Sequence, residues 1–75
     1  MKITSLAKNV TVVEKKNGTL ILISYSTPVA AFVPGEGYLK TSLFHSGTTS
    51  RHVNKWTENR ADEKPQDFFN NLLEA

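Results

Sequence analysis

Apolar residues gather in the first half of the chain in patterns that predict β-strands. Residues 10–16 are rich in β-branched side chains, and residues 20–23 form an uninterrupted apolar run, Leu-Ile-Leu-Ile. Such a run is typical of a strand that is covered on both faces or lies in the middle of a sheet. Asn17-Gly18 stands between the two stretches and predicts a two-residue type I′ hairpin turn. We therefore expect the two stretches to pair as antiparallel strands.

Two further stretches carry strand patterns before the character of the sequence changes. Residues 29–33 are apolar and follow a proline, which cannot donate to a sheet ladder and so bends the chain before that strand. Residues 38–42 alternate between two faces, as a short strand does. Residues 1–9 are interpreted as a weak lead-in, in which Ile3 and Leu6 are expected to supply contacts.

The second half of the chain shifts to helical spacing. A helix that starts near Thr49 places Val53 and Trp56 on one buried face. Pro65 suits the first position of a second helix. The apolar stripe of that helix consists of Phe68, Phe69, Leu72 and Leu73. We expect the stripe to dock on the sheet, to pair with a second copy of the chain or to bind a partner.

These elements predict an α+β fold. The expected architecture is an antiparallel β-meander of about four strands, with one or two C-terminal helices packed on one face. We expect residues 1–60 to form a single small domain and residues 61–75 to form an acidic C-terminal helical tail. A chain of 75 residues buries only a modest core, so that a partner or a homodimer would add to its stability.

Composition narrows the class of protein. The chain contains no cysteine, which excludes disulfides and thiolate metal sites and fits a reducing cytoplasm. We expect no secretory signal and no contact with a membrane, because no apolar run is long enough for either. Seven cations and two anions lie up to Thr57, whereas two cations and five anions follow it. A basic body with an acidic tail permits contact with nucleic acid.

Polar chemistry concentrates between residues 48 and 55. Three successive hydroxyl residues there are able to cap a helix start. Free N–H groups, the helix dipole and the charges of Arg51 and Lys55 would then favour a phosphate. The other interpretation is structural, because such hydroxyls are common caps and such cations are common on solvated helix faces. The candidate binding residues are Thr48, Thr49, Ser50, Arg51, His52 and Lys55.

Catalytic and metal chemistry find little support in the sequence. The chain has two histidines, His45 and His52, and neither has a carboxylate at the spacing of metal ligands. Ser50 and His52 stand two positions apart, so their side chains diverge on a helix and do not form a nucleophile–base pair. We therefore expect no metal, no cofactor and no catalytic residue. These expectations point to a binding protein rather than an enzyme.

Residues 24–30 read SYSTPVA, and residues 48–55 read TTSRHVNK. Both segments resemble those of a family of small, uncharacterised proteins of bacteriophages and other mobile elements. Its members share an S-Y-x-T-x-V-A strand and a later T-T-S-[RK]-H-[IV]-N-K segment. The resemblance spans residues 1–57. It implies a phage accessory protein that works in the cytoplasm of a host cell, and it implies no particular activity.

Two functions follow as hypotheses. The first is binding of nucleic acid or of a phosphate group at residues 48–55, where Arg51 and Lys55 would contact the phosphates. The second is binding to a host enzyme or defence complex as a modulator or inhibitor. Such a host protein would contact a sheet edge or the C-terminal helix. The residues of that helix available to it would be Phe68, Phe69, Leu72 and Leu73.

Overall fold

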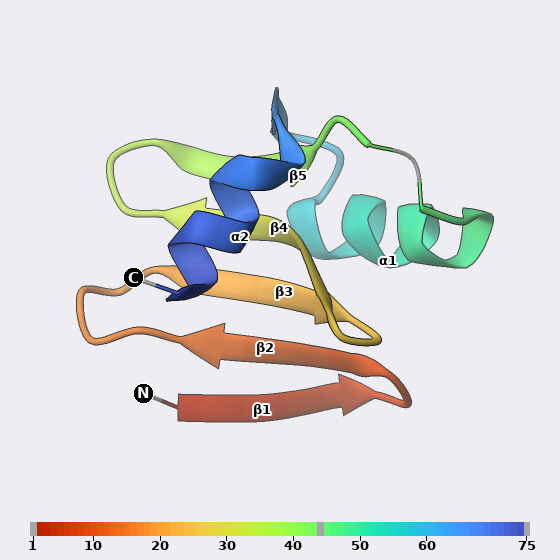
Figure 1. The fold of residues 1–75 in the computed structure, drawn as a ribbon, viewed down its shortest axis with the longest axis horizontal. Coiled ribbons are helices and arrows are strands. Elements are labelled where there is room, and N and C mark those ends of the chain that lie inside the picture. Colours follow the sequence, from red (N-terminus) through yellow and green to blue (C-terminus); the bar gives the residue numbers. More distant parts are fainter. Residues whose placement is uncertain (1, 44, 75) are drawn as a thin grey trace.

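Six strands form one sheet in the computed structural model of the protein, which describes residues 2–43 and 45–74 (Figure 1). In chain order they are β1 (Lys2–Ala7), β2 (Val10–Glu14), β3 (Leu20–Ser24), β4 (Thr27–Val33), β5 (Gly37–Thr41) and β6 (Asp62–Lys64). Helix α1 (Gly47–Thr57) connects β5 to β6, and helix α2 (Gln66–Glu74) follows β6. The α+β class predicted from the sequence is confirmed, with a larger sheet than expected.

The sheet is a meander with one parallel addition. Strands β1 to β5 pair with their neighbours in antiparallel fashion, as the sequence predicted for its central strands. Strand β6 pairs with β5 in parallel. A parallel pair needs a long crossover connection, which α1 supplies here. The sheet is therefore mixed, and its strand order is the order of the chain.

The sequence patterns did not predict the two edge strands. All six residues of β1 are exposed, so the burial that gives a strand its apolar alternation is missing. Ile3 and Leu6 are 67% and 53% exposed and do not supply the core contacts that were expected. Strand β6 consists of Asp-Glu-Lys, where the sequence indicated only a polar end to the preceding helix. Its pairing with β5 makes it a strand.

The hairpin between β2 and β3 is present, but its turn is not of type I′. The N–H of Lys15 donates to the Thr19 carbonyl at 2.8 Å, and the N–H of Gly18 donates to the Lys15 carbonyl at 3.1 Å. Gly18 has a φ of 93°, whereas Asn17 is not among the residues with positive φ. A type I′ turn needs positive φ at both positions, so this is the three-residue loop that ends in a left-handed glycine.

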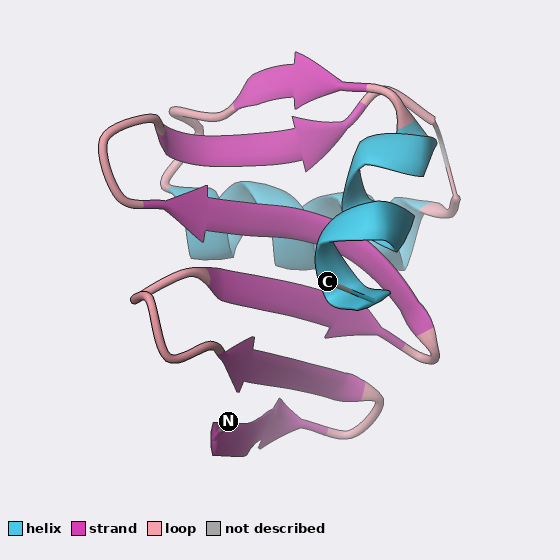
Figure 2. Cartoon of the chain, turned by 60° about the vertical axis from the view of Figure 1, so that its left-hand side comes forward, coloured by secondary structure: helices cyan, strands magenta, loops and turns pink. Residues whose placement is uncertain are grey.

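The two helices cover opposite faces of the sheet, which corrects the expectation that both lie on one face. Figures 1 and 2 show α1 behind the sheet and α2 in front of it. Neighbouring residues of a strand point to opposite faces, and β4 illustrates this. Ala30 packs in a cluster with Val53 of α1, whereas Ala31 packs in a cluster with Phe69 of α2. The small side chains of β4 let both helices approach closely.

Strand β6 and helix α2 continue the fold beyond residue 60, where the sequence analysis placed the end of the domain. Gln66 Nε2 donates to the Pro28 carbonyl at 2.7 Å, and the Thr41 hydroxyl donates to Gln66 Oε1 at 2.8 Å. Lys15 Nζ donates to the Leu72 carbonyl at 2.6 Å. These bonds fasten both ends of α2 to the sheet. The acidic C-terminal segment therefore packs as part of the domain.

Candidate binding site beside helix α1

Ser46 caps the start of α1. Its backbone is extended, and its hydroxyl oxygen accepts a hydrogen bond from the Thr49 N–H at 3.1 Å. The helix begins at Gly47, so Thr48, Thr49 and Ser50 lie inside its first turns and do not cap it. The phosphate hypothesis relied on free N–H groups in the first turn of the helix. The N–H of Thr49 is one of these groups, and it is already hydrogen-bonded to the Ser46 cap.

Thr49 ties this end of α1 to the sheet. Its side chain is 5% exposed. Its Oγ1 lies 2.9 Å from Ser24 Oγ on β3 and accepts a hydrogen bond from Ser46 Oγ at 3.1 Å. A buried hydroxyl with two hydrogen bonds is satisfied within the protein. Thr49 therefore positions the helix and does not offer its hydroxyl to a ligand.

Val53 and Trp56 hold the rest of α1 against the sheet, as their spacing predicted. Val53 is buried in a cluster with Leu22, and Trp56 packs against that cluster. The rings of Trp56 and Tyr38 meet edge to face with centroids 5.5 Å apart. Such contacts between rings add to the stabilisation from buried area. The helix is thereby fixed over the middle of the sheet, and β1 lies beyond it at the edge (Figure 2).

The six predicted binding residues do not meet at one point. Ser50 lines a polar cleft beside β5, whereas His52 and Lys55 line a groove beside β1. Thr48 and Arg51 are exposed and line neither space. A helix turns by about 100° per residue, so residues close in sequence point to different sides. The side chains of these six residues therefore point in different directions, although the residues are close together in the sequence.

The groove beside β1 is an apolar space with a polar rim. It lies between α1 and strand β1 and has a volume of about 440 Å³. Pockets for small molecules have volumes in the range of about 300–1,000 Å³. Leu6 is 53% exposed at this groove. The lining residues are Leu6, Ala7, Val10, Leu22, His52, Lys55, Trp56 and Glu58.

His52 lines the groove and contains a buried polar atom. Its Nδ1 is buried and has no hydrogen-bond partner within the described part of the chain. Buried polar atoms are nearly always paired, because leaving one unpaired costs about 1–3 kcal/mol. Leu6 was expected to supply contacts, but neither Leu6 nor Ala7 was predicted to line a binding site, because residues 1–9 carry no clear strand pattern.

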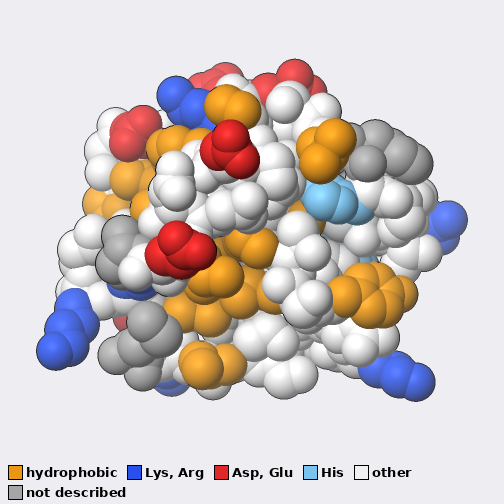
Figure 3. Space-filling model, viewed as in Figure 1, with side chains coloured by type: hydrophobic (Ala, Val, Ile, Leu, Met, Phe, Trp, Pro, Cys, Tyr) orange, Lys and Arg blue, Asp and Glu red, His pale blue; other side chains and the backbone are white. Residues whose placement is uncertain are grey.

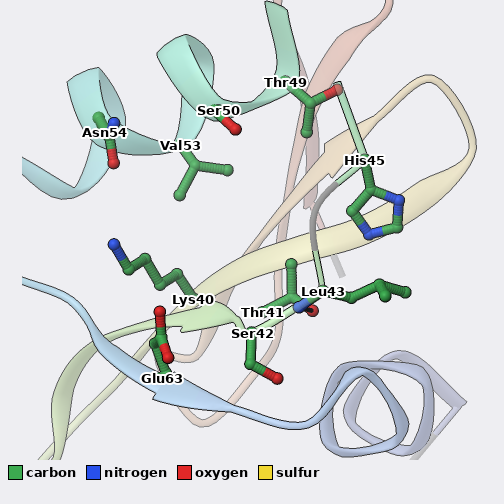
Figure 4. Close-up of a pocket in the computed structure, with 10 residues that line it drawn as sticks. All are labelled: Lys40, Thr41, Ser42, Leu43, His45, Thr49, Ser50, Val53, Asn54 and Glu63. Atoms are coloured by element: carbon green, nitrogen blue, oxygen red, sulfur yellow. Dashed lines mark hydrogen bonds between the residues drawn. The ribbon is translucent and has the colours of Figure 1, made fainter. Parts of the chain in front are cut away.

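The polar cleft lies on the other side of α1 (Figure 4). Lys40 of β5 and Glu63 of β6 both point into it, below Ser50 and Asn54 of α1. Its volume is about 200 Å³, which is below the range of about 300–1,000 Å³ for small-molecule sites. One ammonium and one carboxylate in the same space balance each other. The cleft therefore does not favour an anion such as phosphate.

The apolar stripe of α2 faces the sheet. Phe69 is fully buried against Ala31 and Leu39, and Phe68 and Leu72 pack beside it. Leu73 is half-buried. On this face of the molecule, acidic side chains lie over α2 and basic ones lie at the margin (Figure 3). Of the three roles that the sequence allowed for this stripe, docking on the sheet is the one that the structure shows.

Other classes of site find no support among residues 2–43 and 45–74. No three histidine, aspartate or glutamate side chains in these ranges lie together as a metal ion requires. Neither α1 nor α2 combines the length with the apolar character needed to cross a bilayer.

The chain belongs to a family of unknown function (DUF8033), which matches residues 1–71. An uncharacterised family was expected from the two sequence segments. The match extends beyond the residues 1–57 that those segments indicated, through β6 and into α2. No curated protein and no solved structure matches the chain.

Proposed function

We propose that this protein is a non-enzymatic binding protein that holds a segment of a partner protein in the groove between α1 and β1. The supporting observation is an apolar groove of about 440 Å³ beside an exposed leucine and a buried polar atom without a partner. Apolar floors supply affinity, and a few polar groups fix the orientation of what binds.

The rim of the groove suggests the chemistry of the inserted side chain. Leu6, Val10 and Leu22 supply an apolar floor, whereas Lys55 and Glu58 place opposite charges at the rim. An apolar side chain with a polar tip suits this arrangement, because its body displaces water and its tip pairs with the rim. This assignment takes up the earlier hypothesis of a protein partner but moves its surface from α2, which is docked, to the groove.

A binding role also fits the separation of the reactive groups. His45 Nε2 donates to Gln66 Oε1 at 3.0 Å, and His52 lies in the groove on the other side of α1. Neither histidine is hydrogen-bonded to a carboxylate or a nucleophile in the part of the chain that the structure describes. General acid–base catalysis needs such geometry. The resemblance of residues 24–30 and 48–55 to phage proteins supports a role as an accessory protein in a host cytoplasm.

Replacing Ala7 with phenylalanine tests this proposal. Ala7 is exposed and lines the groove, so the added ring fills it without entering the core. The partner is first identified by a photo-cross-linking amino acid at position 55, with position 71 on α2 as the reference. Calorimetry with that purified partner should then give a dissociation constant raised at least about tenfold by Ala7→Phe.

The matched control is Asn71→Phe, which adds the same ring to an exposed position on the opposite side of the sheet. It should bind like the wild type. Equal affinity of Ala7→Phe and wild type would exclude the groove as the site. The same conclusion follows if positions 55 and 71 cross-link the same proteins equally.

Nucleic acid is the second candidate partner, and the charge of α1 favours it. This helix contains Arg51 and Lys55 and no acidic residue, whereas α2 on the opposite face contains Asp67 and Glu74 and no basic residue. The α1 face is therefore the one that suits a phosphate backbone. Arg51 is exposed and lies one helical turn before Lys55, a spacing that lets both reach the same strand of phosphates.

Fluorescence anisotropy of labelled duplex DNA over a salt series tests this candidate. The logarithm of affinity should fall linearly with the logarithm of salt concentration, and Arg51→Ala/Lys55→Ala should reduce the slope by about 2. The control Lys8→Ala/Lys16→Ala removes the same charge from exposed positions outside α1. Equal slopes for the two double variants would reject α1 as the nucleic-acid surface.

A further inference from the structure

Strand β1 is an exposed edge of the sheet. All six of its residues are exposed, including Ile3 at 67% and Leu6 at 53%. It pairs with β2 on one side only, so the backbone groups of its other side have no strand partner in the described part of the chain. Figure 2 shows it at the margin of the sheet, beyond both helices.

The opposite edge of the sheet lacks these properties. Strand β6 has three residues, and all of them are charged. Short and charged edges resist pairing with another strand. Strand β1 is six residues long, carries a single charge at Lys2 and exposes two large apolar side chains. Its length and exposed apolar residues make it the edge suited to accept a further strand.

Thr4 is the midpoint of residues 2–6, the part of β1 before Ala7. The register with β2 is regular from Lys2 to Ser5 and shifts between Ser5 and Ala7, so that Leu6 lies at the irregularity. Leu6 lines the groove with residues of α1, so alternation places Lys2 and Thr4 on the same face. Ile3 and Ser5 then belong to the opposite face.

We propose that β1 pairs with β1 of a second copy of this chain, antiparallel, with Thr4 opposite Thr4. In this register Lys2 of one copy faces Leu6 of the other on the α1 side. Leu6 and Glu58 line the same groove, so the ammonium of Lys2 meets a carboxylate of opposite charge. The two-fold symmetry forms this pair twice. The two Thr4 side chains make a favourable cross-strand pair at the centre.

The pairing determines where the grooves lie. The two-fold axis of an antiparallel edge-to-edge pair runs perpendicular to the sheet, so both copies present the same face to the same side. The two α1 helices and the two grooves therefore share one face, and the two α2 helices share the other. A partner with two binding segments would engage both grooves and gain from their proximity. This inference goes beyond the proposed function and does not depend on what occupies the groove.

Sedimentation equilibrium of the full chain over a wide range of concentration tests the pairing. The wild type should shift with concentration from the chain mass of 8.4 kDa to twice that mass. Ile3→Lys and Leu6→Lys should raise the dissociation constant of the dimer at least about tenfold, because a charge on an edge strand opposes pairing. Both positions are exposed, so circular dichroism should show the wild-type fold in each variant. Leu43→Lys is the matched control, since Leu43 is 54% exposed outside β1.

A charge exchange makes the register testable by rescue. Lys2→Glu should weaken the dimer, and the double variant Lys2→Glu/Glu58→Lys should restore it. A wild type that stays monomeric at the highest concentration overturns the inference, as does a dimer that Ile3→Lys and Leu6→Lys leave intact. A dimer that the single charge change weakens but the double change does not restore excludes the proposed register. Leu6 and Glu58 also line the groove, so groove binding is judged by Ala7→Phe, which leaves both of these residues unchanged.

Discussion

Replacing Phe69 with alanine should lower the free energy of unfolding by about 3–5 kcal/mol. Phe69 is fully buried between α2 and the sheet, where it packs against Ala31 and Leu39. Removing its ring deletes buried apolar area and leaves a cavity that the flat surface of β4 fills poorly. The total stability of a 75-residue domain is about 4–11 kcal/mol. Urea denaturation followed by circular dichroism should therefore show a midpoint at a much lower urea concentration than that of the wild type.

The neighbouring ring is the matched control. Phe68 is half-buried and meets Phe69 edge to face, with centroids 5.1 Å apart. Phe68→Ala removes the same atoms from a site that water already reaches, so its effect should be clearly smaller than that of Phe69→Ala. Equal effects of the two variants would mean that α2 does not pack as described. A loss below about 1 kcal/mol for Phe69→Ala would lead to the same conclusion.

The pattern of α2 was readable from the sequence, but its partner was not. Phe68, Phe69, Leu72 and Leu73 recur at helical spacing, and this spacing correctly predicted one apolar face. The pattern alone does not say which surface covers that face. Helix α2 packs on the face to which Ala31 points, and α1 packs on the face to which Ala30 points. Both residues are alanines, so the sequence does not indicate which of them faces which helix.

The two edge strands could not be predicted from the pattern of apolar residues. Strands β2, β3 and β4 contain buried residues, and their apolar sequences allowed these strands to be predicted. Residues 2–7 and 62–64 are exposed or polar and become strands because an existing edge offers them hydrogen bonds. Propensity decides little at such positions. Since β1 also forms one side of the groove, missing this strand meant missing the groove.

The candidate site brings together residues that are far apart in the sequence. The groove combines β1, β2 and β3 with α1, whose lining residues lie thirty or more positions away in the chain. Residues 48–55 were predicted to form one binding site because their hydrogen-bond donors are adjacent in the sequence. Helical geometry then sends Ser50 to one side of α1 and His52 to the other. Only His52 and Lys55 of that cluster remain at the groove.

The placement of the helices also converts a charge gradient along the chain into a charge difference across the molecule. Cations prevail up to Thr57 and anions prevail after it. Because α1 and α2 cover opposite faces, the helix with two cations and the helix with two anions are separated by the sheet. Glu58 and Glu63 of the acidic segment lie on the α1 side, where they line the groove and the polar cleft, so the charge difference between the two faces comes from the helices themselves.

A chain that ends after Arg60 should lose its cooperative fold. This truncation follows the domain boundary that the sequence analysis placed at residue 60, and it removes both β6 and α2. The sheet then exposes Ala31 and Leu39 to water and loses the hydrogen bonds made by Gln66. The loss of Phe69 alone is expected to take about 3–5 kcal/mol of the total. The loss of the remaining α2 contacts adds to this, and the sum exceeds the free energy of unfolding expected for a domain of this size.

Thermal unfolding by circular dichroism and the dispersion of amide signals in nuclear magnetic resonance spectra measure this outcome. The truncated chain should show no sigmoidal transition and collapsed amide dispersion, whereas a chain that ends after Glu74 should behave like the wild type. A cooperative transition in the 1–60 fragment would show that α1 and the antiparallel strands form a stable core alone. The groove consists wholly of residues before position 60. Loss of partner binding in this fragment, together with loss of its fold, would therefore show that α2 supports the groove from the opposite face of the sheet.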